Sequence, residues 1–182
     1  MGGSHILVCS IGNPAPYART LHSAGHVVLS ALASMLSYKI EKARSGGGSL
    51  VYVGQEFVLW QSGSFMNVSG TAVAKALKIY GGRQLVVLHD EMELPLGRVK
   101  VTSGHASAKG HNGLRSMTTK DYTRIGIGID RPLSREPDVV AAYVLRKMQG
   151  HERSLSRPSA IPSISAPFTA YSGGKPLKGD EV

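Results

Sequence analysis

The sequence predicts a single α/β domain in which one β-sheet is flanked by helices on both faces. Apolar, strand-like runs alternate along the chain with segments whose apolar residues recur every three or four positions. The 182 residues are 42% hydrophobic and include one cysteine, so a core must supply stability without an internal disulfide. No apolar run approaches the roughly 20 residues that cross a bilayer. We therefore expect no membrane association and a cytoplasmic protein, with a mitochondrial association as the open alternative.

The first half of the chain alternates strand, helix, hairpin and helix. The first strand ends at the turn residues Gly12-Asn13-Pro14, and an apolar stripe at three- and four-residue spacing predicts the helix that follows. A pair of strands, joined as a hairpin or through Gly54, comes next, and Ser69 is a suitable cap for the second helix. The predicted elements are strand 5–11, helix 21–38, strands 50–53 and 56–61, and helix 69–80.

The second half contains an interior strand, a half-exposed strand, a short helix and a last strand. These elements are predicted at residues 85–89, 98–102, 112–118 and 124–130. From residue 150 onward the composition changes, because 14 of the 33 remaining residues are Ser, Pro or Gly. We therefore predict a catalytic domain at residues 1–149 and a poorly ordered tail at residues 150–182.

The charge of the chain favours a polyanionic partner. Its 21 basic and 12 acidic residues leave a net charge of +9, and +8 of this excess falls within residues 1–149. On charge alone, contact with nucleic acid and a solvated, lysine-rich surface are equally good interpretations.

Polar residues follow the predicted strands, where α/β sheets bind their ligands. They comprise amides, a carboxylate and an imidazole: Asn13, Asn67, Asp90, His111 and Asn112. His22, at the start of the first helix, is a candidate general base whose second N–H Asp90 would accept. This set favours hydrolysis without a covalent nucleophile. Taken singly, each residue has a structural alternative, such as an Asx turn at Asn13, a loop closure at Asn67, a turn cap at Asp90 or a surface histidine at position 22.

Other chemistries have weaker support. The sequence has no nucleophile elbow, no Walker motif and no His-Glu-x-x-His, and Cys9 lies inside an apolar strand, where a core position is the stronger interpretation. His22 and His26 are one turn apart and could bind a metal with His105 or His111, but no Cys or carboxylate completes a recognisable spacing. We therefore predict neither a metal nor another cofactor.

Four separated segments contain most of these polar residues: Gly12-Asn-Pro-Ala-Pro-Tyr-Ala-Arg-Thr-Leu-His22, Ser64-Phe-Met-Asn-Val-Ser-Gly70, His89-Asp-Glu-Met-Glu-Leu-Pro-Leu-Gly97 and Gly110-His-Asn-Gly-Leu-Arg-Ser116. They resemble the signature motifs of the bacterial-type peptidyl-tRNA hydrolase family. The strand Arg124-Ile-Gly-Ile-Gly is similar as well, and the resemblance extends over about residues 5–147. It implies a twisted, mixed sheet and hydrolysis of the ester between a peptide and the 3′ ribose of tRNA.

The resemblance also implies a role for each residue. His22 would activate water, Asp90 would orient it, and Asn13 and Asn112 would hold the ester or the water. Asn67 would bond the peptide backbone beside Met66, and Tyr17 and His111 would complete the substrate site. Lys100 and Arg124 match positions that contact tRNA phosphate, and Arg98 and Lys109 lie close to them in the sequence.

The chain departs from the family pattern at several places. Residues 104–110 look more like eukaryotic relatives, Ser23 and Thr102 stand where Asn and a basic residue are usual, and the Ser/Pro-rich tail replaces a C-terminal helix. These departures keep a non-catalytic tRNA- or ribosome-binding module open as the main alternative, with a small-molecule esterase as a third. We expect the protein to act as a monomer.

Overall fold

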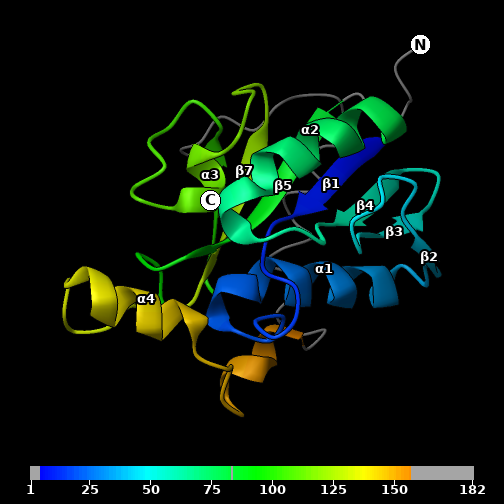
Figure 1. Ribbon diagram of the computed structural model, residues 1–182. Helices are drawn as coiled ribbons and strands as arrows, with labels where there is room; N and C mark the ends of the chain where they lie inside the picture. Colours follow the sequence, from blue (N-terminus) through cyan, green and yellow to red (C-terminus); the bar gives the residue numbers. More distant parts are fainter. Residues whose placement is uncertain (1–4, 83, 157–182) are drawn as a thin grey trace.

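The computed structural model describes residues 5–82 and 84–156, which form one seven-stranded mixed sheet between two layers of helices (Figure 1). The strand order is β2-β3-β4-β1-β5-β7-β6. The strands are β1 (Ile6–Ser10), β2 (Ile40–Lys42), β3 (Leu50–Val53), β4 (Phe57–Gln61), β5 (Gln84–Glu91), β6 (Val99–Ser103) and β7 (Thr123–Gly128).

The four central strands are parallel, so their carboxyl ends meet at one edge of the sheet. β1 pairs in parallel with β4 and β5, and β5 pairs in parallel with β7. The outer strands are antiparallel: β3 forms a hairpin with β4, β2 pairs with β3, and β6 pairs with β7. This arrangement confirms the predicted mixed sheet and, of the two alternatives for the strands around Gly54, shows the hairpin.

The helices cover both faces of the sheet. Figure 1 shows α2 and α3 above the sheet and α1 below it, with α4 beside the entrance to α1. The α-helices are α1 (Ala24–Met35), α2 (Ser69–Tyr80), α3 (Asn112–Arg115) and α4 (Pro137–Leu145), and the 3-10 turns are η1 (Leu21–Ser23), η2 (Met66–Val68) and η3 (Glu152–Ser156). No helix in the described part of the chain is long and apolar enough to span a membrane.

Alternating side chains of the central strands fill two cores, one on each face. In β1, Ile6 and Val8 pack with α1, whereas Leu7 and Cys9 pack on the opposite face with residues of α2 and α3. This alternation follows from the two-residue period of a strand. Cys9 is fully buried as predicted, and burial raises the pKa of its thiol, so it remains protonated and unreactive.

The sequence analysis missed two elements, β2 and α4, for physical reasons. All three residues of β2 are exposed, so it has no apolar pattern to detect. In α4 only Val144 is buried, so this helix contributes little to either core. By contrast, the predicted helix 69–80 matches α2, while the helix predicted from residue 21 begins as the 3-10 turn η1 and becomes α-helical at Ala24.

The packed part of the chain extends beyond residue 149, where we placed the start of the tail. Leu155 of η3 is 1% exposed and belongs to the core on the α1 side. Glu152 is also buried, accepts hydrogen bonds from both terminal nitrogens of Arg146, and accepts another from the backbone N–H of Gln149. Residues 150–156 thus belong to the folded body, and the rest of the predicted tail lies outside the described residues.

Candidate active site

A cavity of about 590 Å³ opens at the carboxyl ends of the parallel strands. Its lining comes from the segments after β1 and β4, the end of β5, the loop before α3, and α4. All eight predicted catalytic and substrate-binding residues line it: Asn13, Tyr17, His22, Met66, Asn67, Asp90, His111 and Asn112. Sequence reasoning placed these residues at strand ends, and the parallel pairing of β1, β4 and β5 brings most of them to one edge.

His111 reaches the cavity by a different route. Strand β6 runs antiparallel to β7, so its carboxyl end lies at the opposite edge of the sheet. The loop 104–111 returns the chain to the cavity, where His111 caps the short helix α3 by accepting the backbone N–H of Leu114 at 3.3 Å. Two residues after His111, Gly113 packs so tightly against Met66 that a Cβ at this position would collide with the sulfur atom of Met66.

Asp90 is the centre of the site. The carboxylate accepts a hydrogen bond from His22 Nδ1 at 2.9 Å to each oxygen, and a second from His111 Nε2 at 2.9 Å to Oδ1. The Asp90 side chain is 2% exposed, and those of His22 and His111 are 15% and 11% exposed. Burial alone would raise the pKa of Asp90, but the two histidines outweigh it and hold the pKa far below its usual range.

These contacts determine the tautomers of both histidines. An ionised carboxylate only accepts hydrogen bonds, so His22 carries its hydrogen on Nδ1, and Nε2 remains as the lone-pair nitrogen. His111 donates from Nε2 and accepts at Nδ1, so both of its nitrogens are already engaged by the protein. Burial lowers the pKa of His22, but the charge and hydrogen bonds of Asp90 reverse this effect and leave the pKa above its ordinary value of 6.5.

His89 is a neighbour that the sequence did not single out. It is 2% exposed and donates from Nδ1 to the backbone carbonyl of Asp90 at 2.7 Å. Burial and the neighbouring His111 lower its pKa to about 3, so His89 is neutral at physiological pH. Its place directly before Asp90, at the end of an apolar strand, was the only available signal, and that position is equally typical of a core residue.

Asn13 is oriented by its backbone and side-chain contacts. Its Oδ1 accepts the backbone N–H of Met66 at 2.9 Å, and its own N–H donates to Ser23 Oγ at 3.0 Å. Ser23 Oγ in turn donates to the carbonyl of Tyr17. With Oδ1 occupied, the amide hydrogens of Asn13 are the groups left for a ligand. Asn67 and Asn112 are exposed at the cavity, where no side-chain bond engages either of them among the described residues.

The predicted phosphate-binding residues divide into two groups. Lys109 and Arg124 line the cavity, whereas Arg98 and Lys100 are exposed at the outer strand β6 and do not line it. Arg124 is only 5% exposed and donates from Nη2 to the carbonyl of Ser107 at 2.7 Å. Ser107 Oγ accepts the backbone N–H of Lys109, so the buried Arg124 holds the loop that carries the exposed Lys109.

An apolar wall of the cavity was missed together with α4. It consists of the residues of that helix at positions 137, 140, 141, 144 and 145: Pro137, Val140, Ala141, Val144 and Leu145. Their spacing of three and four residues is the helical signal that the sequence contained. Because the stripe faces a cavity, most of the helix stays unburied. Tyr143 anchors it by donating to the carbonyl of Ile129 at 2.7 Å.

His22, Asp90 and His111 also form the one group able to hold a metal ion within residues 5–82 and 84–156. Their ligand atoms lie within 4.8 Å of one another. The pairing of His22 with His26 that the sequence left open does not occur, because His26 is buried and contacts Ser10 Oγ at 2.8 Å through Nδ1. In the described structure, the polar atoms of the group bond each other directly.

Comparison with known proteins identifies the family. The model of the family described as peptidyl-tRNA hydrolase matches residues 7–170. The chain belongs to the peptidyl-tRNA hydrolase family. The peptidyl-tRNA hydrolase of Rhodococcus jostii is 36% identical over 157 residues, which cover 81% of each chain. That of Mycobacterium tuberculosis is 36% identical over 159 residues, or 82% of each chain.

A solved structure supports the same family. The peptidyl-tRNA hydrolase of Acinetobacter baumannii superposes with a TM-score of 0.74 at 26% identity, covering 94% of this chain and 95% of that chain. These relatives of peptidyl-tRNA hydrolase type are bacterial, so the likeness of residues 104–110 to eukaryotic members stays a prediction.

Proposed function

We propose that this chain hydrolyses the ester bond of peptidyl-tRNA with a water molecule activated by His22. The observation that carries the proposal is the His22–Asp90 pair, because it presents an oriented imidazole in a cavity of the size of a small peptide or nucleotide. Family membership supports the substrate, and the basic residues around the cavity suit a polyanionic one.

The reaction needs one proton acceptor and donors for the developing oxyanion. Nε2 of His22 takes a proton from water as the water oxygen attacks the ester carbon, and Asp90 stabilises the imidazolium that forms. The amide hydrogens of Asn13 donate to the oxyanion, since Oδ1 is held by Met66. On collapse of the tetrahedral intermediate the bond to the ribose oxygen breaks, and the imidazolium returns the proton to that oxygen. The products are a free carboxylic acid and tRNA.

The remaining cavity residues bind the two ends of the substrate. Asn67 and Asn112 offer amides to the peptide backbone, and Tyr17 and Met66 contact it beside them. Backbone contacts are indifferent to side-chain identity, as an enzyme that meets many peptides requires. In this proposal, the exposed Arg98, Lys100 and Lys109 contact phosphates, while Arg124 adds its charge to the cavity and holds the loop of Lys109.

His111 has a positioning role in this proposal. Because both of its ring nitrogens are engaged, it acts on the reaction by holding the carboxylate of Asp90 rather than by bonding substrate through its nitrogens. The proposal also includes a monomeric state, since all the named side chains come from one chain. It places the protein in the cytoplasm as well. Light scattering on the purified protein measures its mass, and a dimer would contradict this part.

The decisive experiment compares ester cleavage of an N-acetyl-aminoacyl-tRNA by the native protein and by His22→Asn. We expect kcat to fall by about 10²- to 10⁴-fold, the usual worth of a general base, while binding of deacylated tRNA is retained. His105→Asn is the matched control, because His105 is exposed and pairs only with the exposed Asp121. An inactive native protein that binds tRNA would favour the non-catalytic module instead. Equal rates for native protein and His22→Asn would overturn the mechanism.

A further inference from the structure

A second hollow, of about 850 Å³, borders the same chain segments as the catalytic cavity. Tyr17 and His22 line the cavity, whereas Ala18 and Arg19 line the second hollow. On the other side, Leu145 lines the cavity and Lys147 the hollow. We call this hollow the basic groove. It is lined by the turn before η1, one face of α1, β4 and the chain after α4: Ala15, Pro16, Ala18, Arg19, His26, Val27, Ser30, Ala31, Ser34, Gln61, Lys147, Met148 and Arg153.

The basic groove carries exposed positive charge. Arg19 and Lys147 line it, and no Asp or Glu occurs in its lining within residues 5–82 and 84–156. Arg19 and Lys147 are exposed, and no ion pair engages either of them in the described part of the chain. Because burial lowers the pKa of His26 to about 4, that residue adds no charge at neutral pH.

The backbone holds Arg19 and Lys147 at a fixed place relative to His22. The N–H of Met148 donates to the carbonyl of Arg19 at 3.0 Å, and Thr20 and Lys147 form an antiparallel bridge. The N–H of Leu21, directly before His22, donates to the carbonyl of Arg146 at 3.2 Å. The pairing that positions His22 therefore also positions Arg19 and Lys147.

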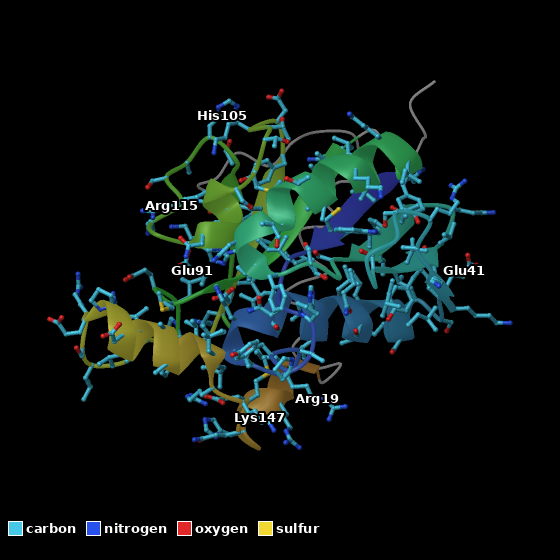
Figure 2. All side chains as sticks on the ribbon, in the orientation of Figure 1. Arg19, Glu41, Glu91, His105, Arg115 and Lys147 are labelled. Atoms are coloured by element: carbon cyan, nitrogen blue, oxygen red, sulfur yellow. The ribbon has the colours of Figure 1, made fainter. Side chains whose placement is uncertain are left out.

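We propose that the basic groove binds phosphates of the same tRNA whose 3′ end occupies the cavity. This inference rests on the proposed function and adds a second contact region to it. Figure 2 shows Arg19 and Lys147 together at the lower edge of the molecule, whereas His105 lies near the upper edge. The open groove with exposed cations suits a backbone of repeated phosphates better than a single enclosed anion.

The test compares two double variants that remove the same charge. Arg19→Ala/Lys147→Ala removes the two groove cations. Lys39→Ala/Lys42→Ala removes two exposed lysines at β2, the outermost strand on the side of the sheet away from β6. Both are assayed at several salt concentrations with N-acetyl-aminoacyl-tRNA and with the same ester on a CCA trinucleotide. Thermal unfolding checks that each variant is folded.

With the tRNA ester, we expect the groove variant to raise KM by roughly tenfold at low salt and to leave kcat unchanged. The slope of log(kcat/KM) against log salt should become shallower by about 1 to 2, since each phosphate contact contributes about 0.7 to 0.9 to it. The CCA ester carries only the last three nucleotides of tRNA and lacks the phosphates of the acceptor stem, so we expect its kinetics not to change. The control variant should match the native protein with both substrates.

Three results would overturn the proposal. An equal KM increase in both double variants would assign the effect to net charge. A loss with the CCA ester would show that Arg19 and Lys147 act through the His22 segment. If inorganic phosphate displaced tRNA at an ionic strength at which chloride did not, the groove would be a binding site for a small anion.

An inactive native protein would instead count against the proposed hydrolysis. Fluorescence anisotropy with deacylated tRNA then tests the basic groove separately. Weaker binding by the groove variant than by the control would support it, and equal binding would overturn it.

Discussion

His22 and His26 lie one helical turn apart, yet their surroundings give them opposite chemistry. His22 contacts the carboxylate of Asp90 at the cavity, and its pKa is raised. His26 faces the hydroxyl of Ser10 in the interior, and burial lowers its pKa to about 4. The comparison shows that the partner and the burial of an imidazole, more than its position on a helix, decide whether its pKa lies above or below the ordinary value.

The largest expected effect on turnover comes from removing the charge of Asp90, which contacts His22 but not His26. In Asp90→Asn, we expect kcat to fall by about 10²- to 10⁴-fold, because the amide no longer stabilises the imidazolium or selects the tautomer of His22. Steady-state kinetics with the tRNA ester measure this, and tRNA affinity should stay within about twofold. An equal loss of affinity would contradict an orienting role for Asp90.

The pH profile of the same variant sharpens the comparison. His22 must be neutral to act as a base, so kcat/KM falls as pH drops through its pKa, which lies above 6.5 in the native protein. Asp90→Asn removes the charge that raises this pKa and leaves burial, which lowers it. The acid limb of its residual activity should therefore move to lower pH. If the acid limb of the pH profile did not move, the pKa seen in the native profile would belong to a group other than His22.

A smaller effect concerns stability in acid. The folded-state pKa of His26 is about 4 and its unfolded value about 6.5, so the unfolded chain binds more protons between these limits. The free energy of unfolding should decrease by about 3 kcal/mol from this group as pH falls from about 6.5 to 4. His22 contributes with the opposite sign, since its raised pKa favours the folded state at low pH and this contribution is lost as pH rises through that pKa.

Urea unfolding of His26→Gln at pH 7 and pH 5 measures the contribution of His26. The variant should lose less stability between these two values than the native protein does. His105→Gln, at an exposed position, is the control and should behave like the native protein. If His26→Gln and the native protein lost the same amount, the neutral, buried state of His26 would be refuted.

The smallest effect tests the partner of His26 alone. Ser10→Ala leaves His26 Nδ1 without its bond to the hydroxyl, so we expect a loss of about 1 to 3 kcal/mol in the free energy of unfolding. Turnover and its acid limb should not change, because Ser10 faces the interior and not the cavity. A shifted acid limb in the Ser10→Ala variant would contradict the expectation that His22 and His26 titrate independently.

The motifs of the sequence were sufficient to predict the main residues of the site and most of the sheet. Asn13 and Asp90 were proposed from their places after apolar runs and His22 from its place at the start of the first helix, and the structure brings all three to one cavity. Helix α2 was also predicted within its observed bounds because its apolar stripe packs on the core. Such features are local, so hydrophobic periodicity and turn residues are enough to reveal them.

Other properties depend on contacts between segments that are distant in sequence. The burial of Arg124 against Ser107, the engagement of both nitrogens of His111, and the apolar wall of α4 arise only when loops and helices meet. The same is true of the basic groove, in which Arg19 and Lys147 become neighbours through backbone pairing.

The sequence by itself determined the family, the residue types of the site and the excess of positive charge. Only the tertiary structure decided that His111 also meets the carboxylate of Asp90, which cations stay exposed and which are buried, and that the folded body includes residues 150–156. The physical reason is that burial and neighbouring charges set pKa values and accessibility, and both are properties of assembled surfaces rather than of local sequence.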